Sequence, residues 1–188
     1  MWAKTAIGTS TSWKGAIVSV ERVLGDGSYI VLTREDAKEL FAQQDDASVR
    51  AVAERLRKSP KHIEAELVLN CGTLWDPLHR SLTDGTLDRD TGDFPVDHTV
   101  LGGKRLHKGD GFEAILIRPD IVPHVAAGLH DLKRAEFTKR YLALDPKSYG
   151  KQPTEAEGDA TWAMLKLIRQ LFEDAGNEHA AVLFTVAR

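Results

Sequence analysis

The sequence has a single cysteine, Cys71, among its 188 residues. One cysteine cannot form an intrachain disulfide, and it cannot build a zinc site of several cysteines. A chain without a disulfide framework suits a reducing compartment, where thiols stay free. We therefore expect a cytoplasmic protein in which Cys71 is a free, buried thiol.

Long apolar runs are also missing. No stretch approaches the roughly 20 apolar residues that a membrane-spanning helix needs. The N-terminal segment, MWAKTAIGTSTSWKG, lacks the long apolar core of a secretory signal. We therefore expect a soluble protein without a membrane partner.

An excess of basic charge is absent as well. The formal net charge is −3 and the pI is about 6.2, whereas a nucleic-acid-binding domain usually has a basic stripe and a high pI. The composition therefore argues against a nucleic-acid partner. Hydrophobic residues make up 42% of the chain and charged residues 28%, which is typical of one globular domain and not of a disordered segment.

The motifs of common catalytic and metal sites are missing too. The sequence has no H-E-x-x-H zinc motif, no G-x-S-x-G nucleophile elbow and no phosphate-binding P-loop. The aspartates of the loop at 84–98 lack the spacing and the closing glutamate of an EF-hand. We therefore predict no metal and no cofactor, and spacing alone assigns no catalytic residue.

What the sequence does contain is a mixture of helical and strand periodicities. Helices are predicted at about 47–58, 74–83, 120–132, 134–144 and 155–175, and strands at 29–32, 63–69, 112–117 and 180–186. For the segment 63–69 a short helix is the alternative. Thr33 and Asp36 resemble a capping box that starts one more helix. The last strand is almost wholly apolar, so we expect it to be central and buried on both faces.

These elements predict an α+β fold: a single compact domain with a small mixed sheet packed with several helices. The N-terminus has the weakest pattern. We assign residues 1–28 to an N-terminal extension, in which GAIVSVERV (15–23) could be a strand, and residues 29–188 to the domain itself.

The segment LWDPLHRSL (74–82) is the most distinctive stretch. Trp75 and His79 are spaced so that they share one helical face with two leucines. His79 is therefore either a hydrogen-bonded core histidine or a ligand or base that faces a cleft. Asp76 before Pro77 is typical of a helix start, with Asp76 as the N-cap; the alternative is a catalytic acid.

An Asp-rich loop follows this helix directly, and long loops often carry function. If the chain has a site, we expect it in the cleft between the helix at 74–83 and the loop at 84–103. The candidate binding residues are Trp75, Asp76, His79, Asp97 and His98.

The chain resembles the YfbM-like family of small bacterial proteins, a domain family of unknown function. The segment LWDPLHRSLTDG is similar to the family's W-x-x-L-H-x-x-L-T-G pattern. Further blocks follow in the family's order, namely YIVLTREDAKELF (29–41), TVLGG (99–103), IRPDIVPHVAAGLHDL (117–132) and LIRQLFEDAGNEHAAVLFTV (167–186).

The resemblance implies a compact α+β domain but no activity and no catalytic residues. It also has departures. Many members have D-x-D-K-x-W before the tryptophan, where this sequence has Asn70, Gly72 and Thr73, and Asp84 displaces the glycine of L-T-G. A site that depended on those acids would be altered here.

Two functional hypotheses remain open. The first is a non-catalytic binding or protein-interaction domain, for example of the immunity or antitoxin type, because the chain is small and acidic and lacks a catalytic signature. Its partner would be another protein. The alternative is a small hydrolase-type enzyme that uses His79 with a nearby acid.

Overall fold

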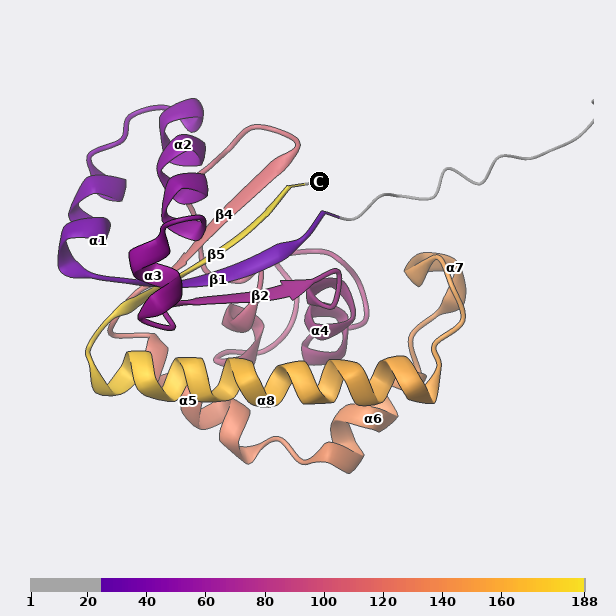
Figure 1. The fold of residues 1–188 in the computed structure, drawn as a ribbon. Coiled ribbons are helices and arrows are strands. Elements are labelled where there is room, and N and C mark those ends of the chain that lie inside the picture. Colours follow the sequence, from indigo (N-terminus) through magenta and orange to yellow (C-terminus); the bar gives the residue numbers. More distant parts are fainter. Residues whose placement is uncertain (1–24, 188) are drawn as a thin grey trace, which may run out of the picture.

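The computed structural model describes residues 25–187 (Figure 1). The predicted extension at 1–28, including its strand at 15–23, lies outside the described residues except for positions 25–28. The last two of these positions already belong to the first strand, because Gly27 pairs with the neighbouring strand on each side.

Five strands form one sheet in the order β2–β1–β5–β4–β3. Their bounds are β1 Gly27–Leu32, β2 Val68–Gly72, β3 Lys104–Arg105, β4 Phe112–Ile117 and β5 Ala181–Ala187. Every neighbouring pair is antiparallel. The α+β prediction is confirmed, but the expectation of a mixed sheet is wrong. The direction of a strand depends on the path by which its connecting segment returns to the sheet. The periodicity of the side chains carries no information about that path.

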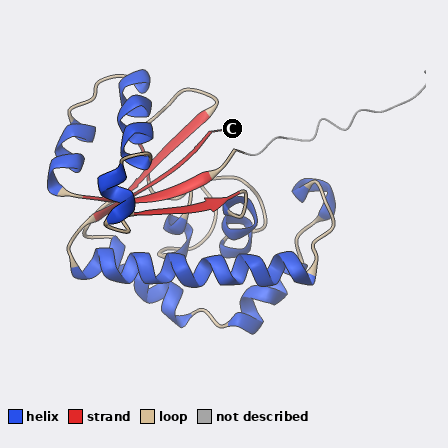
Figure 2. Ribbon diagram, in the orientation of Figure 1, coloured by secondary structure: helices blue, strands red, loops and turns tan. Residues whose placement is uncertain are grey.

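Two groups of helices cover the two faces of the sheet (Figures 1 and 2). The first group is α1 Arg34–Phe41, α2 Asp46–Arg57 and α3 Pro60–Glu64. The second is α4 Trp75–Leu82, α5 Val122–Asp131, α6 Arg134–Leu142 and α8 Glu155–Asn177. The connections also contain α7 Pro146–Tyr149 and a 3-10 helix, η1 Val96–Thr99.

Strand β5 lies in the middle of the sheet and separates two apolar cores. Val182 and Phe184 face the core shared with the second helix group, whereas Ala181 and Leu183 face the core under the first. Successive side chains of a strand point to opposite faces, so an almost continuous apolar run is what a strand covered on both sides requires. The expectation for this strand is confirmed.

The start of α1 also follows the sequence pattern. The Thr33 hydroxyl accepts a hydrogen bond from the Asp36 backbone nitrogen at 3.2 Å, and the Asp36 carboxylate accepts one from the Thr33 backbone nitrogen at 3.0 Å. This reciprocal pair is the predicted capping box. It fixes the sharp exit of the chain from β1 into the first helix group.

The predicted strand at 63–69 is wrong in its first half. Pro60 follows the end of α2 and also occupies the first turn of α3. A proline fits there because the backbone N–H groups of a first turn have no partner within the helix. The chain then turns at Glu66, which has a φ of 56°. As a result β2 begins only at Val68.

The start of α4 also differs from the prediction. Asp76 is not the N-cap; that position is Leu74, and Asp76 and Pro77 both lie inside the first turn. A proline is tolerated anywhere in this turn, because the first backbone N–H groups have no partner within the helix. The Asp76 carboxylate is thereby free to pair with a side chain one turn later.

Candidate functional site

Helix α4 carries three of the predicted site residues, and all of its side chains are buried. Trp75 packs its ring 6.2 Å from that of Phe184 and donates a hydrogen bond from Nε1 to the carbonyl oxygen of Gly25 at 2.9 Å. The backbone of Gly27 is so close that a Cβ there would approach the Trp75 ring to 2.8 Å. Trp75 therefore fastens the start of β1 to α4.

His79 has only 1% of its surface exposed. Its Nε2 lies 2.8 Å from the carbonyl oxygen of Asp88. A carbonyl oxygen only accepts hydrogen bonds, so Nε2 carries a proton and donates it. This contact ties the loop that follows α4 to the helix, and it is a structural use of the imidazole.

Asp76 neutralises a buried arginine. Its Oδ1 accepts a hydrogen bond from Arg80 Nε at 2.5 Å, and the two side chains are 3% and 4% exposed. The guanidinium also donates to the carbonyl oxygens of Gly85 at 3.0 Å and Ser148 at 3.2 Å. A buried arginine is tolerated only when it is paired, so Asp76 allows Arg80 to join three segments of the chain.

Asp97 and His98 lie in η1, which packs on α4 and α5. Asp97 Oδ1 accepts hydrogen bonds from the backbone nitrogen and from Nδ1 of His98, each at 2.8 Å. The His98 ring also makes an edge-on contact with Phe94, with the ring centroids 5.3 Å apart. The structure thus brings these two predicted residues together, half-buried and bonded to each other.

A second histidine cluster was not found from the sequence. His62 bonds to Ser59 Oγ through Nδ1 at 3.0 Å and to Asp36 Oδ2 through Nε2 at 2.9 Å. Burial raises the pKa of Asp36, but hydrogen bonds from Thr33 and His62 outweigh it, and the pKa lies below its usual value. Since Asp36 also caps α1, this cluster clamps α1 to α3. No local signal links Asp36 to His62, which are 26 positions apart.

Two adjoining pockets form a groove beside the outermost strand, which we call the α8–β2 groove. One pocket, of about 500 Å³, lies between β2 and α8. The other, of about 400 Å³, lies at the end of β1 where α8 leads into β5. The pockets share Val31, Leu67 and Glu178, so they are continuous.

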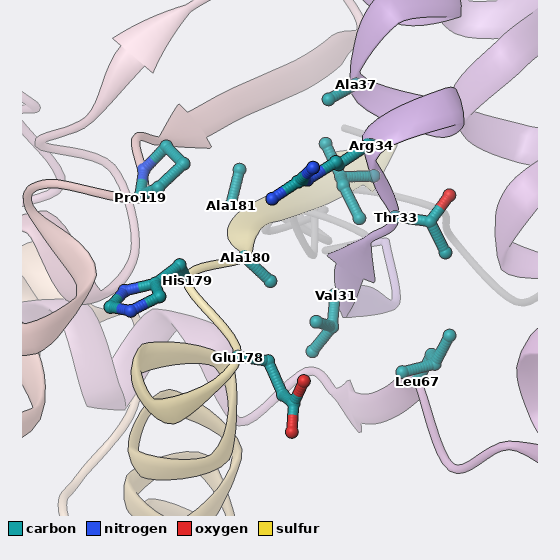
Figure 3. A pocket seen from close by; sticks show the side chains of 11 residues that line it. Val31, Thr33, Arg34, Ala37, Leu67, Pro119, Glu178, His179, Ala180 and Ala181 are labelled. Atoms are coloured by element: carbon teal, nitrogen blue, oxygen red, sulfur yellow. The ribbon is translucent and has the colours of Figure 1, made fainter.

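The groove has an apolar floor. Between β2 and α8 it is lined by Leu69, Leu167 and Leu171, of which Leu167 is 54% exposed. The apolar lining of the pocket at the end of β1 combines larger side chains with alanines, namely Val31, Leu32, Leu67, Pro119, Ala37, Ala180 and Ala181 (Figure 3). A single exposed leucine is ordinary, but an apolar lining that continues along a groove is a feature of interaction sites.

The two ends of the groove differ in charge. Acidic side chains line the part between β2 and α8, namely Glu66, Asp174 and Glu178, and no basic residue lines it. Arg34 and His179 lie at the other end, near the end of β1 (Figure 3). The groove therefore offers apolar contact together with a negative rim over most of its length.

None of the five predicted site residues lines the groove. One weak signal for it is present in the sequence. Leu167 is an apolar residue at the edge of the α8 stripe formed by Leu165, Ile168 and Leu171. Val31, Leu69 and Leu167 come from three distant segments, so only the tertiary fold brings them together.

Two further observations concern metal-ligand groups and membrane-spanning helices in the described part of the chain. Within residues 25–187, no three histidine, cysteine, aspartate or glutamate side chains are grouped so that they could hold a metal ion. None of the helices in the same range combines the length and the apolar character needed to cross a bilayer.

Comparison with known proteins gives a consistent result. The family model described as "Domain of unknown function (DUF1877)" matches residues 26–185. The fold is similar to the crystal structure of YfbM from Escherichia coli, a protein of unknown function, with a TM-score of 0.64 and 19% sequence identity over 86% of this chain and 99% of that chain. No curated protein matches.

Proposed function

This chain belongs to the DUF1877 family of domains of unknown function, and from that premise we propose that it is a non-catalytic domain that binds another protein. The α8–β2 groove is the observation that carries this proposal. It combines an apolar floor, in which Leu167 is exposed, with acidic side chains that form no salt bridge to any residue within 25–187, and an apolar centre with a polar rim is typical of protein interfaces.

Neutralisation of a basic partner, as by an immunity protein or an antitoxin, is one form of this function. The net charge of −3 and the acidic rim of the groove support an attraction to such a partner. We also propose that the protein acts in the cytoplasm, where the buried thiol of Cys71 would stay reduced.

A small hydrolase that uses His79 with a nearby acid is the alternative. Its weakness is that the side chains of His79 and Asp76 already make structural contacts. His79 Nε2 donates to the Asp88 carbonyl, and Asp76 balances the charge of Arg80. A general acid or base must reach a substrate, and at 1% exposure His79 would first have to be uncovered.

Photo-crosslinking tests the binding proposal. The full chain carrying Leu167→p-benzoylphenylalanine is expressed in its own cells and irradiated. We expect one discrete protein adduct, because Leu167 lies exposed on the groove floor. Adding Asp174→Lys and Glu178→Lys should remove that adduct.

The matched control is the same substitution at Leu142, which is 42% exposed on α6 and does not line the groove. Equal adducts from both positions, or none from Leu167, would contradict the proposal. Circular dichroism melts of each variant separate loss of binding from loss of folding.

A further inference from the structure

Strand β2 ends the sheet on one side, and its outer edge has no strand partner among the described residues. In Figure 1 it is the strand that runs directly above α8, so the groove follows this edge. A free strand edge presents backbone N–H and C=O groups that can pair with another chain. The edge residues include no lysine and no proline, the side chains that commonly block such pairing.

The register shows which backbone groups face outward. Val31 donates its backbone N–H to the carbonyl of Leu67 at 2.8 Å, and two residues further along Leu69 is opposite Tyr29. In an antiparallel pair the residues that bond to the partner alternate with residues that point away from it. Leu67 and Leu69 therefore bond to β1, and the backbone groups of Val68 and Asn70 point to the open side.

The side chains beside this edge indicate what a pairing strand would carry. Leu69, Leu167 and Leu171 offer contacts for apolar side chains, and strand residues that alternate would place every second side chain on this floor. Glu66 and Glu178 form no ion pair with any other residue in the range 25–187. A lysine or arginine on the face of the incoming strand that meets this floor would lay its apolar stem on the leucines and bring the missing counter-charge to these acids.

We propose that the α8–β2 groove binds an extended peptide segment with alternating apolar and basic residues, which adds to the sheet as a further strand along β2. This inference rests on the proposed binding function and specifies its partner and its mode. Backbone hydrogen bonds to Val68 and Asn70 supply affinity, and the leucine floor and the acids select the sequence.

The first test uses a capped peptide of four Val-Lys repeats with a fluorescent label, and its dissociation constant for the full chain is measured by anisotropy. An alternating peptide puts all its lysines on one face of a strand and all its valines on the other, so every lysine can face the groove together. Asp174→Lys with Glu178→Lys should weaken binding about tenfold or more, because it replaces attraction by repulsion. Raising the salt concentration should weaken binding to the unsubstituted chain.

The matched control is Glu173→Lys, which changes the charge of α8 next to Asp174 but lies outside the groove lining. It should leave the dissociation constant within about twofold, since Glu173 lies outside the contact and its nearest charged neighbour is His130, at 3.7 Å. A capped Val-Glu peptide of the same length should not bind. Equal binding of both peptides, or equal weakening by both sets of protein variants, overturns the charge selection.

The second test addresses the strand addition itself. Two Val-Lys peptides are made, one N-methylated on the valine amides and one on the lysine amides. Only one of the two sets of amides can face β2, so one peptide should bind like the parent and the other should lose binding. If both bind equally or both fail, strand addition is overturned.

The outcomes keep the two proposals apart. If the charge reversals in the groove weaken binding but the two methylated peptides bind equally, the added strand is rejected and the binding function is retained. A second outcome is that the peptide does not bind, while the full chain self-associates and Asp174→Lys with Glu178→Lys abolishes this association. The occupant of the groove is then a second copy of the chain, and the peptide is rejected. If the chain that carries only the photo-crosslinker at Leu167 forms no adduct, the binding function itself is rejected.

Discussion

At the scale of single residues, the polar side chains of α4 show how a reactive-looking cluster can be structural. A buried polar group loses water and must recover hydrogen bonds inside the protein. His79 recovers one at the Asp88 carbonyl, and Arg80 recovers several, including that to Asp76. The bonds to the carbonyl oxygens of Asp88 and Gly85 join α4 to the loop that follows it, whereas the bond between Arg80 and Asp76 lies within α4 and balances the buried charge.

The first prediction is that His79→Ala destabilises the fold. It removes a buried ring and leaves the Asp88 carbonyl without that donor, which should cost about 2–4 kcal/mol of unfolding free energy. The melting temperature should fall by about 5–15 °C for a chain of this size. His130→Ala is the control, because the His130 side chain is 74% exposed. An unchanged melting temperature with loss of the Leu167 crosslink would assign His79 to function.

At the scale of elements, α8 is the longest helix and supports both the groove and the second helix group. Its two glycines have different surroundings. A Cβ at Gly158 would lie 2.8 Å from the Tyr141 ring, whereas a Cβ at Gly176 would meet its nearest neighbours at 3.8 Å. Tyr141 is itself held, since its hydroxyl donates to Glu157 at 2.7 Å. Gly158 is therefore required by packing, and Gly176 is not.

The second prediction follows from this contrast. Gly158→Ala should destabilise the protein by about 1–3 kcal/mol, because Tyr141 must shift. Gly176→Ala should stabilise it by up to about 1 kcal/mol, because alanine loses less backbone entropy in a helix. Chemical denaturation of both variants measures the difference. Stabilisation by both substitutions would show that Tyr141 gives way without cost.

At the scale of the whole molecule, carboxylates with a lowered pKa are spread over both helix groups. Burial raises the pKa of Glu157, but hydrogen bonds from Lys151 and Tyr141 outweigh it and leave the pKa below its usual value. Asp36 behaves in the same way with Thr33 and His62. The folded state therefore holds protons at these groups less tightly than the unfolded chain does.

The third prediction is a loss of stability in acid. A group whose pKa is lowered by folding stabilises the protein above its unfolded pKa, which is 3.8 for Asp36 and 4.5 for Glu157, and this contribution disappears as the pH falls through the folded pKa. Urea denaturation should show a steady unfolding free energy near pH 6–7 and a decline below about pH 4.5. Asp36→Asn with Glu157→Gln should make that decline shallower; an equally steep decline would place the titrating groups elsewhere.

Local patterns predicted several elements well. The capping box at Thr33, the two-sided burial of β5 and the length of α8 all depend on neighbours within a few positions. The errors arose where one residue suits two local structures. Pro60 can end one helix or begin the next, and Asp76 can cap a helix or pair one turn along it.

By itself the sequence determined the fold class, the family and the inner face of α4, because periodicity and residue order are local properties of a chain. Only the tertiary structure decided that His79 meets the Asp88 carbonyl and that β2 is left at an edge of the sheet beside α8. A periodic pattern shows which side of an element is apolar, but not which segment will cover it. The groove exists because nothing in the described part of the chain covers Leu167 and the edge of β2.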